Sequence, residues 1–84
     1  MTTDPIAWVW RTLPKWTLDD DLANGMQPTE AAAKQAAEAA LHNPKAVAAM
    51  VYPVGLHAGK WVALMKPSIG LLTTSGTVRW HDPV

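Results

Sequence analysis

The sequence predicts an α+β domain, in which a small antiparallel sheet of three to four strands carries one long Ala-rich helix on one face. A second short helix on the same face is an open alternative. Two observations predict this class. Several short segments rich in Trp, Val and Thr alternate along the chain with turn residues, and one longer segment is rich in Ala, the strongest helix former. With 84 residues, of which 49% are hydrophobic, residues 1–84 are expected to form a single domain.

The first strand is expected at residues 6–13. Side chains alternate between the two faces of a strand, so Trp8 and Trp10 share one face while Val9 and Arg11 share the other. The proline that follows ends the strand, because it has no N–H for a ladder hydrogen bond.

Two short features follow this strand. Residues 16–18 fit a brief second strand. Residues 19–25 have the composition of a polar turn, which we expect to end in Asn24-Gly25.

A helix is expected at residues 29–42. Thr29 is placed to cap the first N–H groups, and Glu30 lies in the first turn, where the helix dipole favours an anion. The opposite side is nearly all Ala, which would let the helix lie close to a sheet. Charged residues recur every four positions and predict one solvated stripe, formed by Glu30, Lys34 and Glu38.

The segment after this helix fits two structures. Asn43 as a cap and Pro44 in a first turn favour a short helix over residues 44–51. The same apolar run also fits a strand, and we prefer the helix. In both cases Pro53 and Gly55 are expected to end the element.

The last third of the chain has the pattern of three strands. They are expected at residues 60–66, 69–74 and 77–81, with the Ser-Gly pair at 75–76 as the hairpin turn between the last two. The glycine-containing stretch 55–61 differs from a phosphate loop in its glycine spacing and leads into a strand, so we interpret it as a turn.

Several of these strands carry apolar residues on both faces. In residues 61–65, for example, Trp61 and Met65 point one way and Val62 points the other. One Ala-rich helix, even with a short second one, covers about one face of such a sheet. We therefore expect another chain to cover the second face, because monomers seldom expose apolar patches above roughly a few hundred Å². The alternative is that residues 6–25 fold over that face as a hairpin.

Composition narrows the function classes. The chain has no Cys and hence no disulfide or thiol nucleophile, and its zero net charge argues against tight, sequence-independent binding to DNA. The His residues lack metal-ligand spacing and no catalytic serine motif occurs, so we expect a protein that is not an enzyme and has no metal and no cofactor. No apolar run could span a membrane and the chain does not begin like a signal peptide, which predicts a cytoplasmic protein.

The candidate binding residues are mainly aromatic, because Trp is enriched at interface hot spots. Four Trp residues are expected to anchor a partner and one Arg to make a rim contact, namely Trp8, Trp10, Trp61, Trp80 and Arg79. Packing in the core is the competing role for the same indoles. Together with the cations Lys60, Lys66 and Arg79, the Trp set predicts, as an alternative, a stacking platform for single-stranded nucleic acid.

Two segments carry a resemblance to known proteins. Trp8-Val9-Trp10 in the first strand and PTEAAA at residues 28–33, which opens the Ala-rich helix, resemble small orphan accessory proteins of actinobacterial phages and their high-GC hosts. The resemblance implies a host-interacting or regulatory protein that acts by binding, and it transfers no catalytic residue. The expected function is therefore protein–protein interaction, with a second copy of the chain (a homodimer) or a host protein as partner.

Overall fold

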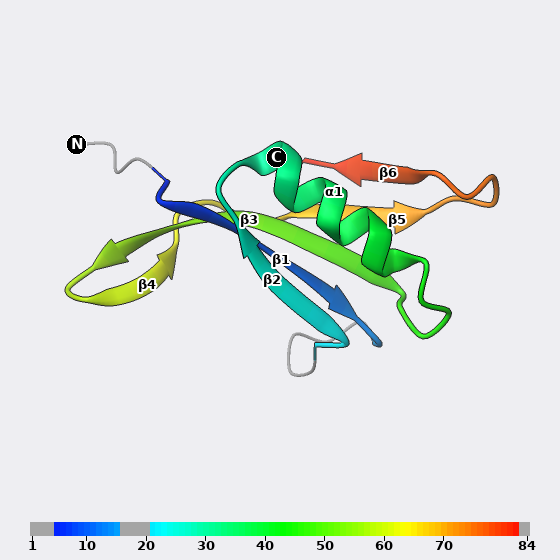
Figure 1. Ribbon diagram of the computed structural model, residues 1–84, viewed down its shortest axis with the longest axis horizontal. Coiled ribbons are helices and arrows are strands. Elements are labelled where there is room, and N and C mark those ends of the chain that lie inside the picture. Colours follow the sequence, from blue (N-terminus) through cyan, green and yellow to red (C-terminus); the bar gives the residue numbers. More distant parts are fainter. Residues whose placement is uncertain (1–4, 16–20, 83–84) are drawn as a thin grey trace.

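The chain runs in the order β-β-α-β-β-β-β in the computed structural model, which describes residues 5–15 and 21–82 (Figure 1). The strands are β1 (Ala7–Leu13), β2 (Ala23–Gln27), β3 (Ala48–His57), β4 (Lys60–Ala63), β5 (Ser68–Leu72) and β6 (Val78–His81), and the helix is α1 (Glu30–Leu41).

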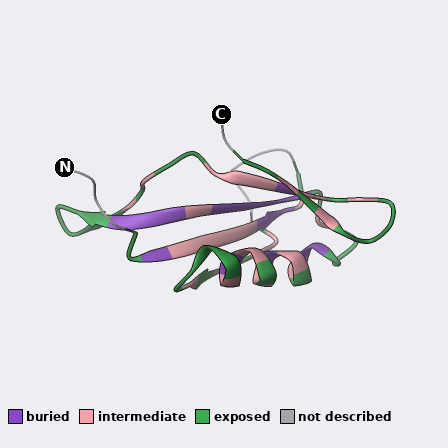
Figure 2. Cartoon of the chain, turned by 90° about the horizontal axis from the view of Figure 1, so that it is seen from above, coloured by how far each residue is buried: buried purple, intermediate pink, exposed green. Residues whose placement is uncertain are grey.

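All six strands belong to one antiparallel sheet. The order is β2-β1-β3-β5-β6, and β4 pairs with the end of β3 that β5 leaves free. The helix packs on one face, mainly against β1 and β3, as a separate layer below the strands in Figure 2. The predicted class, an antiparallel sheet with a helix on one face, is confirmed. The predicted number of three to four strands is wrong, and the part of the chain that the structure describes contains one helix rather than two.

The helix α1 forms for the reasons that the sequence indicates. Thr29 has an extended backbone, and its Oγ1 accepts a hydrogen bond from the Ala32 N–H at 3.1 Å. The Ala-rich side faces the sheet, where Ala33, Ala37 and Leu41 are buried. They form the core cluster together with residues of β3 and the partly buried indoles of β1 and β6.

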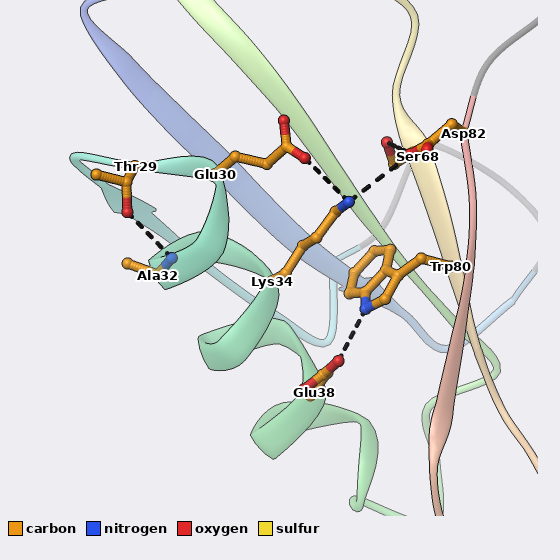
Figure 3. A network of polar contacts seen from close by, with 8 residues as sticks. All are labelled: Thr29, Glu30, Ala32, Lys34, Glu38, Ser68, Trp80 and Asp82. Atoms are coloured by element: carbon orange, nitrogen blue, oxygen red, sulfur yellow. Dashed lines mark hydrogen bonds and ion pairs between the residues drawn. The ribbon is translucent and has the colours of Figure 1, made fainter.

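The charged stripe of α1 is not solvated as predicted, because β6 lies close to it. Glu30 and Lys34 form the expected ion pair at 3.0 Å, but the Lys34 Nζ also lies 3.7 Å from Asp82 and 5.4 Å above the Trp80 ring. Glu38 accepts a hydrogen bond from the Trp80 Nε1 at 2.9 Å (Figure 3). The stripe therefore joins the helix to the last strand.

The preference for a short helix at residues 44–51 is wrong, since β3 occupies Ala48–His57. The prediction that Pro53 and Gly55 end the element is also wrong, because the strand continues through both. Along this side of β3, β5 pairs only with residues before Pro53 and β4 only with residues after it. A proline is tolerated at this change of partner because no ladder hydrogen bond needs its missing N–H. Its carbonyl accepts from the Leu64 N–H at 2.9 Å.

The turn predicted at residues 19–25 is wrong at its end, because Asn24 and Gly25 lie within β2. Gly25 pairs with Trp10 of β1, and a Cβ added at this glycine would lie 2.6 Å from the indole Nε1. The glycine is therefore required by the ring that packs on it and not by a turn. The strand predicted at residues 16–18 lies outside the described residues.

The three C-terminal strands occur in the predicted order, with β4 and β5 shorter than expected. The β3–β4 connection is a two-residue turn in which Ala58 and Gly59 have φ of 52° and 77°, the signature of a type I′ hairpin. The predicted Ser-Gly turn between β5 and β6 is confirmed, with Gly76 at φ 87° and its N–H donating to the Thr73 carbonyl at 3.0 Å.

Candidate functional site

The helix is much shorter than the sheet beneath it. Its 12 residues rise about 18 Å at 1.5 Å per residue, whereas the longest dimension of the molecule is 42 Å. Beyond the first turn of α1, β3 continues into β4 as a hairpin that extends to the left in Figure 1. We define the hairpin arm as Ile6 together with residues 54–65. Within the described part of the chain, no helix covers either face of this arm.

The arm carries a concentration of exposed apolar side chains. Seven large apolar side chains are exposed among the described residues, and four of them belong to the arm: Ile6 (54%), Leu56 (48%), Trp61 (53%) and Met65 (61%). Leu56 and Trp61 are directly paired across β3 and β4, so their side chains lie together on the face without the helix. Met65 lies towards the other face, where it lines a pocket with Trp8, so the expectation that Trp61 and Met65 point the same way is wrong. Ile6 lies towards this face as well, because it is two residues from Trp8. Each face of the arm therefore exposes two large apolar side chains.

The outer edge of β4 is open. β4 pairs only with β3, and no other described strand lies against it. The Leu64 N–H donates to the Pro53 carbonyl at 2.9 Å. Because backbone groups alternate between the two sides of an antiparallel strand, Trp61 and Ala63 direct their N–H and C=O groups to the outer edge. Residues 61–65 are uncharged and are flanked by a lysine at each end.

The rest of the helix-free face differs from the arm. At the far end of the sheet from the arm, Leu13, Ala48 and Met50 are buried on this face. Arg11 directs its Nε and Nη2 to the same Asp21 oxygen, each at 2.6 Å. Burial lowers the pKa of Arg11, but the hydrogen bonds and charges of Asp21 and, to a smaller extent, Tyr52 together raise it above its ordinary value. This end is closed and charge-paired, and so it is a poorer docking surface.

The hairpin that the sequence offered as an alternative cover for the second face is not formed by the described residues. Both β1 and β2 pair within the sheet itself instead of folding over it. That another chain covers the second face stays a prediction. The exposed apolar surface that such a chain would cover is the arm.

The structure divides the predicted anchor residues between two places. Trp8, Trp10 and Trp80 lie on the face that α1 covers and pack against the core cluster. Trp61 is exposed on the arm, and Arg79 is exposed on β6 at the helix-free face. Of this set, only Trp61 belongs to the arm. Trp8 lies at the root of the arm, on the face that α1 covers. Partner contact by any of these residues stays a prediction.

Other kinds of site find little support in the described residues. Of the four described Trp residues, Trp61 alone is exposed, whereas a stacking platform for bases needs several accessible rings. Within residues 5–15 and 21–82, no group of three His, Asp or Glu side chains could hold a metal ion. The described helix is not long and apolar enough to cross a membrane.

Comparison of the chain with protein-family models, with curated proteins and with solved structures finds no match. Sequence reasoning identified Trp61 but missed Ile6, Leu56 and Met65. The signal that could have found them is length, because a helix of about 12 residues cannot cover a hairpin that extends past its first turn.

Proposed function

We propose that the chain is a non-enzymatic protein-interaction module, that the hairpin arm is its binding surface, and that a second copy of the chain is the partner. The observation that carries this proposal is the arm itself, which exposes large apolar side chains on both faces and is open at its edge. Exposed apolar surface beyond scattered single residues marks interaction sites in soluble proteins. An unpaired strand edge is a template on which another strand adds.

Pairing of two β4 strands supports a second copy as the occupant. When Val62 of each copy faces Val62 of the other across a two-fold axis, Trp61 of one copy opposes Ala63 of the other. The outward N–H and C=O groups of these residues then pair, which gives about four hydrogen bonds. The large Trp61 ring of one copy lies beside the small methyl group of Ala63 of the other, so the two side chains fit without a clash. In this register Lys60 opposes Leu64 and meets no like charge.

The resemblance to phage accessory proteins supports a second kind of partner, a host protein. Such a partner would use the same exposed side chains and would compete with self-association. The two partners are separated by the mass of the purified protein alone, because a homodimer needs no other component.

Sedimentation velocity over a concentration series tests the proposal. The wild-type protein is expected to reach twice the 9.1 kDa mass of one chain. Ala63→Pro removes only an outward N–H, so it should block the dimer and leave the β3–β4 ladder intact. Trp61→Ala should weaken the dimer. Leu72→Ala should not, because Leu72 is an exposed apolar residue at the end of β5, at the opposite end of the sheet from the arm.

Circular dichroism of each variant checks that the fold is retained. A wild-type protein that stays monomeric up to about 100 μM would contradict self-association through the arm. A dimer that Leu72→Ala weakens as much as Trp61→Ala would also contradict it. Binding of a single-stranded oligonucleotide that weakens steeply with salt would instead favour the nucleic-acid alternative.

A further inference from the structure

A small pocket lies at the root of the hairpin arm, next to the first turn of α1. Its volume is about 220 Å³. Val51 and Pro53 are its buried apolar part, and the half-buried Trp8 and the exposed Met65 extend the apolar lining. Four polar residues complete it: Glu30, Lys66, Ser68 and Asp82. Sites for drug-sized ligands usually span about 300–1,000 Å³, so this pocket suits only a small molecule.

One wall of the pocket is formed by two carboxylates that both contact Lys34. Lys34 holds Glu30 and Asp82 together, with its Nζ 3.0 Å from the Glu30 Oε1 and 3.7 Å from the Asp82 Oδ1. The Ser68 hydroxyl donates to the same Asp82 oxygen at 3.0 Å. Figure 3 shows these side chains converging from α1, β5 and the end of β6. Each carboxylate uses one oxygen in these contacts, which leaves its second oxygen to accept from a ligand.

Lys66 adds a cation to the lining from the connection between β4 and β5. It is exposed, and no carboxylate of the described residues pairs with it. Together with Lys34, the lining and its network carry two positive and two negative charges. The lining and its network are therefore neutral overall and hold both signs of charge, so a ligand that carries both charges matches them better than a simple cation or a simple anion.

We propose that this pocket binds a small zwitterion with an apolar body, of which an apolar α-amino acid is the simplest example. Its ammonium group would donate to the free carboxylate oxygens of Glu30 and Asp82, and its carboxylate would accept from Lys66. The apolar side chain would lie on Trp8 and Val51. This arrangement pairs each charge of the ligand with an opposite charge and buries its apolar part.

Isothermal titration calorimetry with three probes tests the charge requirement. L-leucine carries both charges, isoamylamine lacks the carboxylate and 4-methylpentanoate lacks the ammonium group. Leucine is expected to bind at least about tenfold more tightly than either analogue, because each analogue loses one charge-assisted hydrogen bond. Equal binding of all three, or no saturable binding of leucine, would overturn the proposal.

Variants and indole NMR signals locate the site. Lys66→Gln should weaken leucine binding at least about tenfold, and Lys45→Gln, an exposed lysine beyond the other end of α1, should not change it. The Trp8 indole N–H signal should shift on titration while that of Trp61 stays in place. Loss of binding in Lys45→Gln, or a shift at Trp61 alone, would contradict the assignment. Trp61→Ala should retain leucine binding, so failure of the dimer and failure of this site are distinguishable.

Discussion

Replacing Gly25 by Ala should destabilise the protein, although Ala ordinarily suits a strand better than Gly. The backbone at this position is not in the left-handed region, so Ala itself introduces no strain there. The obstacle is the Trp10 indole, whose Nε1, Cε2 and Cζ2 would lie 2.6, 2.7 and 2.8 Å from the new Cβ. Favourable contacts between such atoms need about 3.5–4.0 Å, so the ring has to move by about 1 Å.

The ring has little space into which it can move. It packs against the core cluster under α1, where Ala33 and Ala37 are completely buried. Overpacking a filled core costs about 1–3 kcal/mol, and the lower unfolded-state entropy of Ala returns about 0.5–1 kcal/mol. The net expectation is a loss of about 1–2 kcal/mol, which for a domain of this size lowers Tm by roughly 5–15 °C.

Urea and thermal unfolding followed by circular dichroism measure this loss. Trp10→Val removes the ring, so Gly25→Ala made in that background should no longer destabilise, and the double-mutant cycle isolates the contact. A Gly25→Ala protein as stable as the wild type would refute the reasoning, because it would mean that the indole does not fill the space above the glycine.

Three further substitutions test other parts of the fold, each by urea unfolding. Thr29→Ala removes the acceptor for the Ala32 N–H and should cost about 1 kcal/mol, which an unchanged midpoint would contradict. Ala58→Gly relieves a positive φ in the β3–β4 turn and should stabilise by up to about 1 kcal/mol, whereas destabilisation would mean that the turn has another geometry. Glu38→Ala should cost about 1 kcal/mol more than Glu38→Gln, which keeps an acceptor for Trp80, and equal losses would remove that hydrogen bond from the account.

Local signals made α1 predictable from the sequence. Its cap, its Ala-rich face and its Glu30–Lys34 pair all lie within one segment, and each occurs as expected. The prediction of a solvated stripe on α1 was wrong because it depended on a contact with a distant part of the chain. The position of Trp80 beside Glu38 depends on a strand 42 residues further along the chain, which no local pattern indicates.

The wrong predictions of a helix where β3 lies and of a turn where β2 lies have the same origin. Pro53 is compatible with β3 because β5 and β4 meet opposite it, and β2 needs Gly25 because the Trp10 ring packs on this position. Proline and glycine are read from sequence as ends and turns. Here the role of each residue depends on a neighbouring strand that is distant in sequence. Interpreting the proline as an end and the glycine as a turn therefore predicts the wrong element.

The candidate site was predictable in part. Trp61 was identified because its strand is apolar on both faces. Ile6, Leu56 and Met65 were not, because their exposure depends on where α1 starts relative to the β3–β4 hairpin. Trp10 and Trp80 were identified as anchors, yet the structure uses their indoles to pack the helix.

Amide hydrogen exchange at Trp61 and Ala63 tests the arm as a binding surface most directly. In one isolated chain these two N–H groups face solvent at the open edge of β4, and they should exchange quickly. Protection of both amides that rises with protein concentration is the predicted result. Fast exchange at both positions at every concentration, in samples whose β1 and β3 amides remain protected, would contradict pairing through this edge.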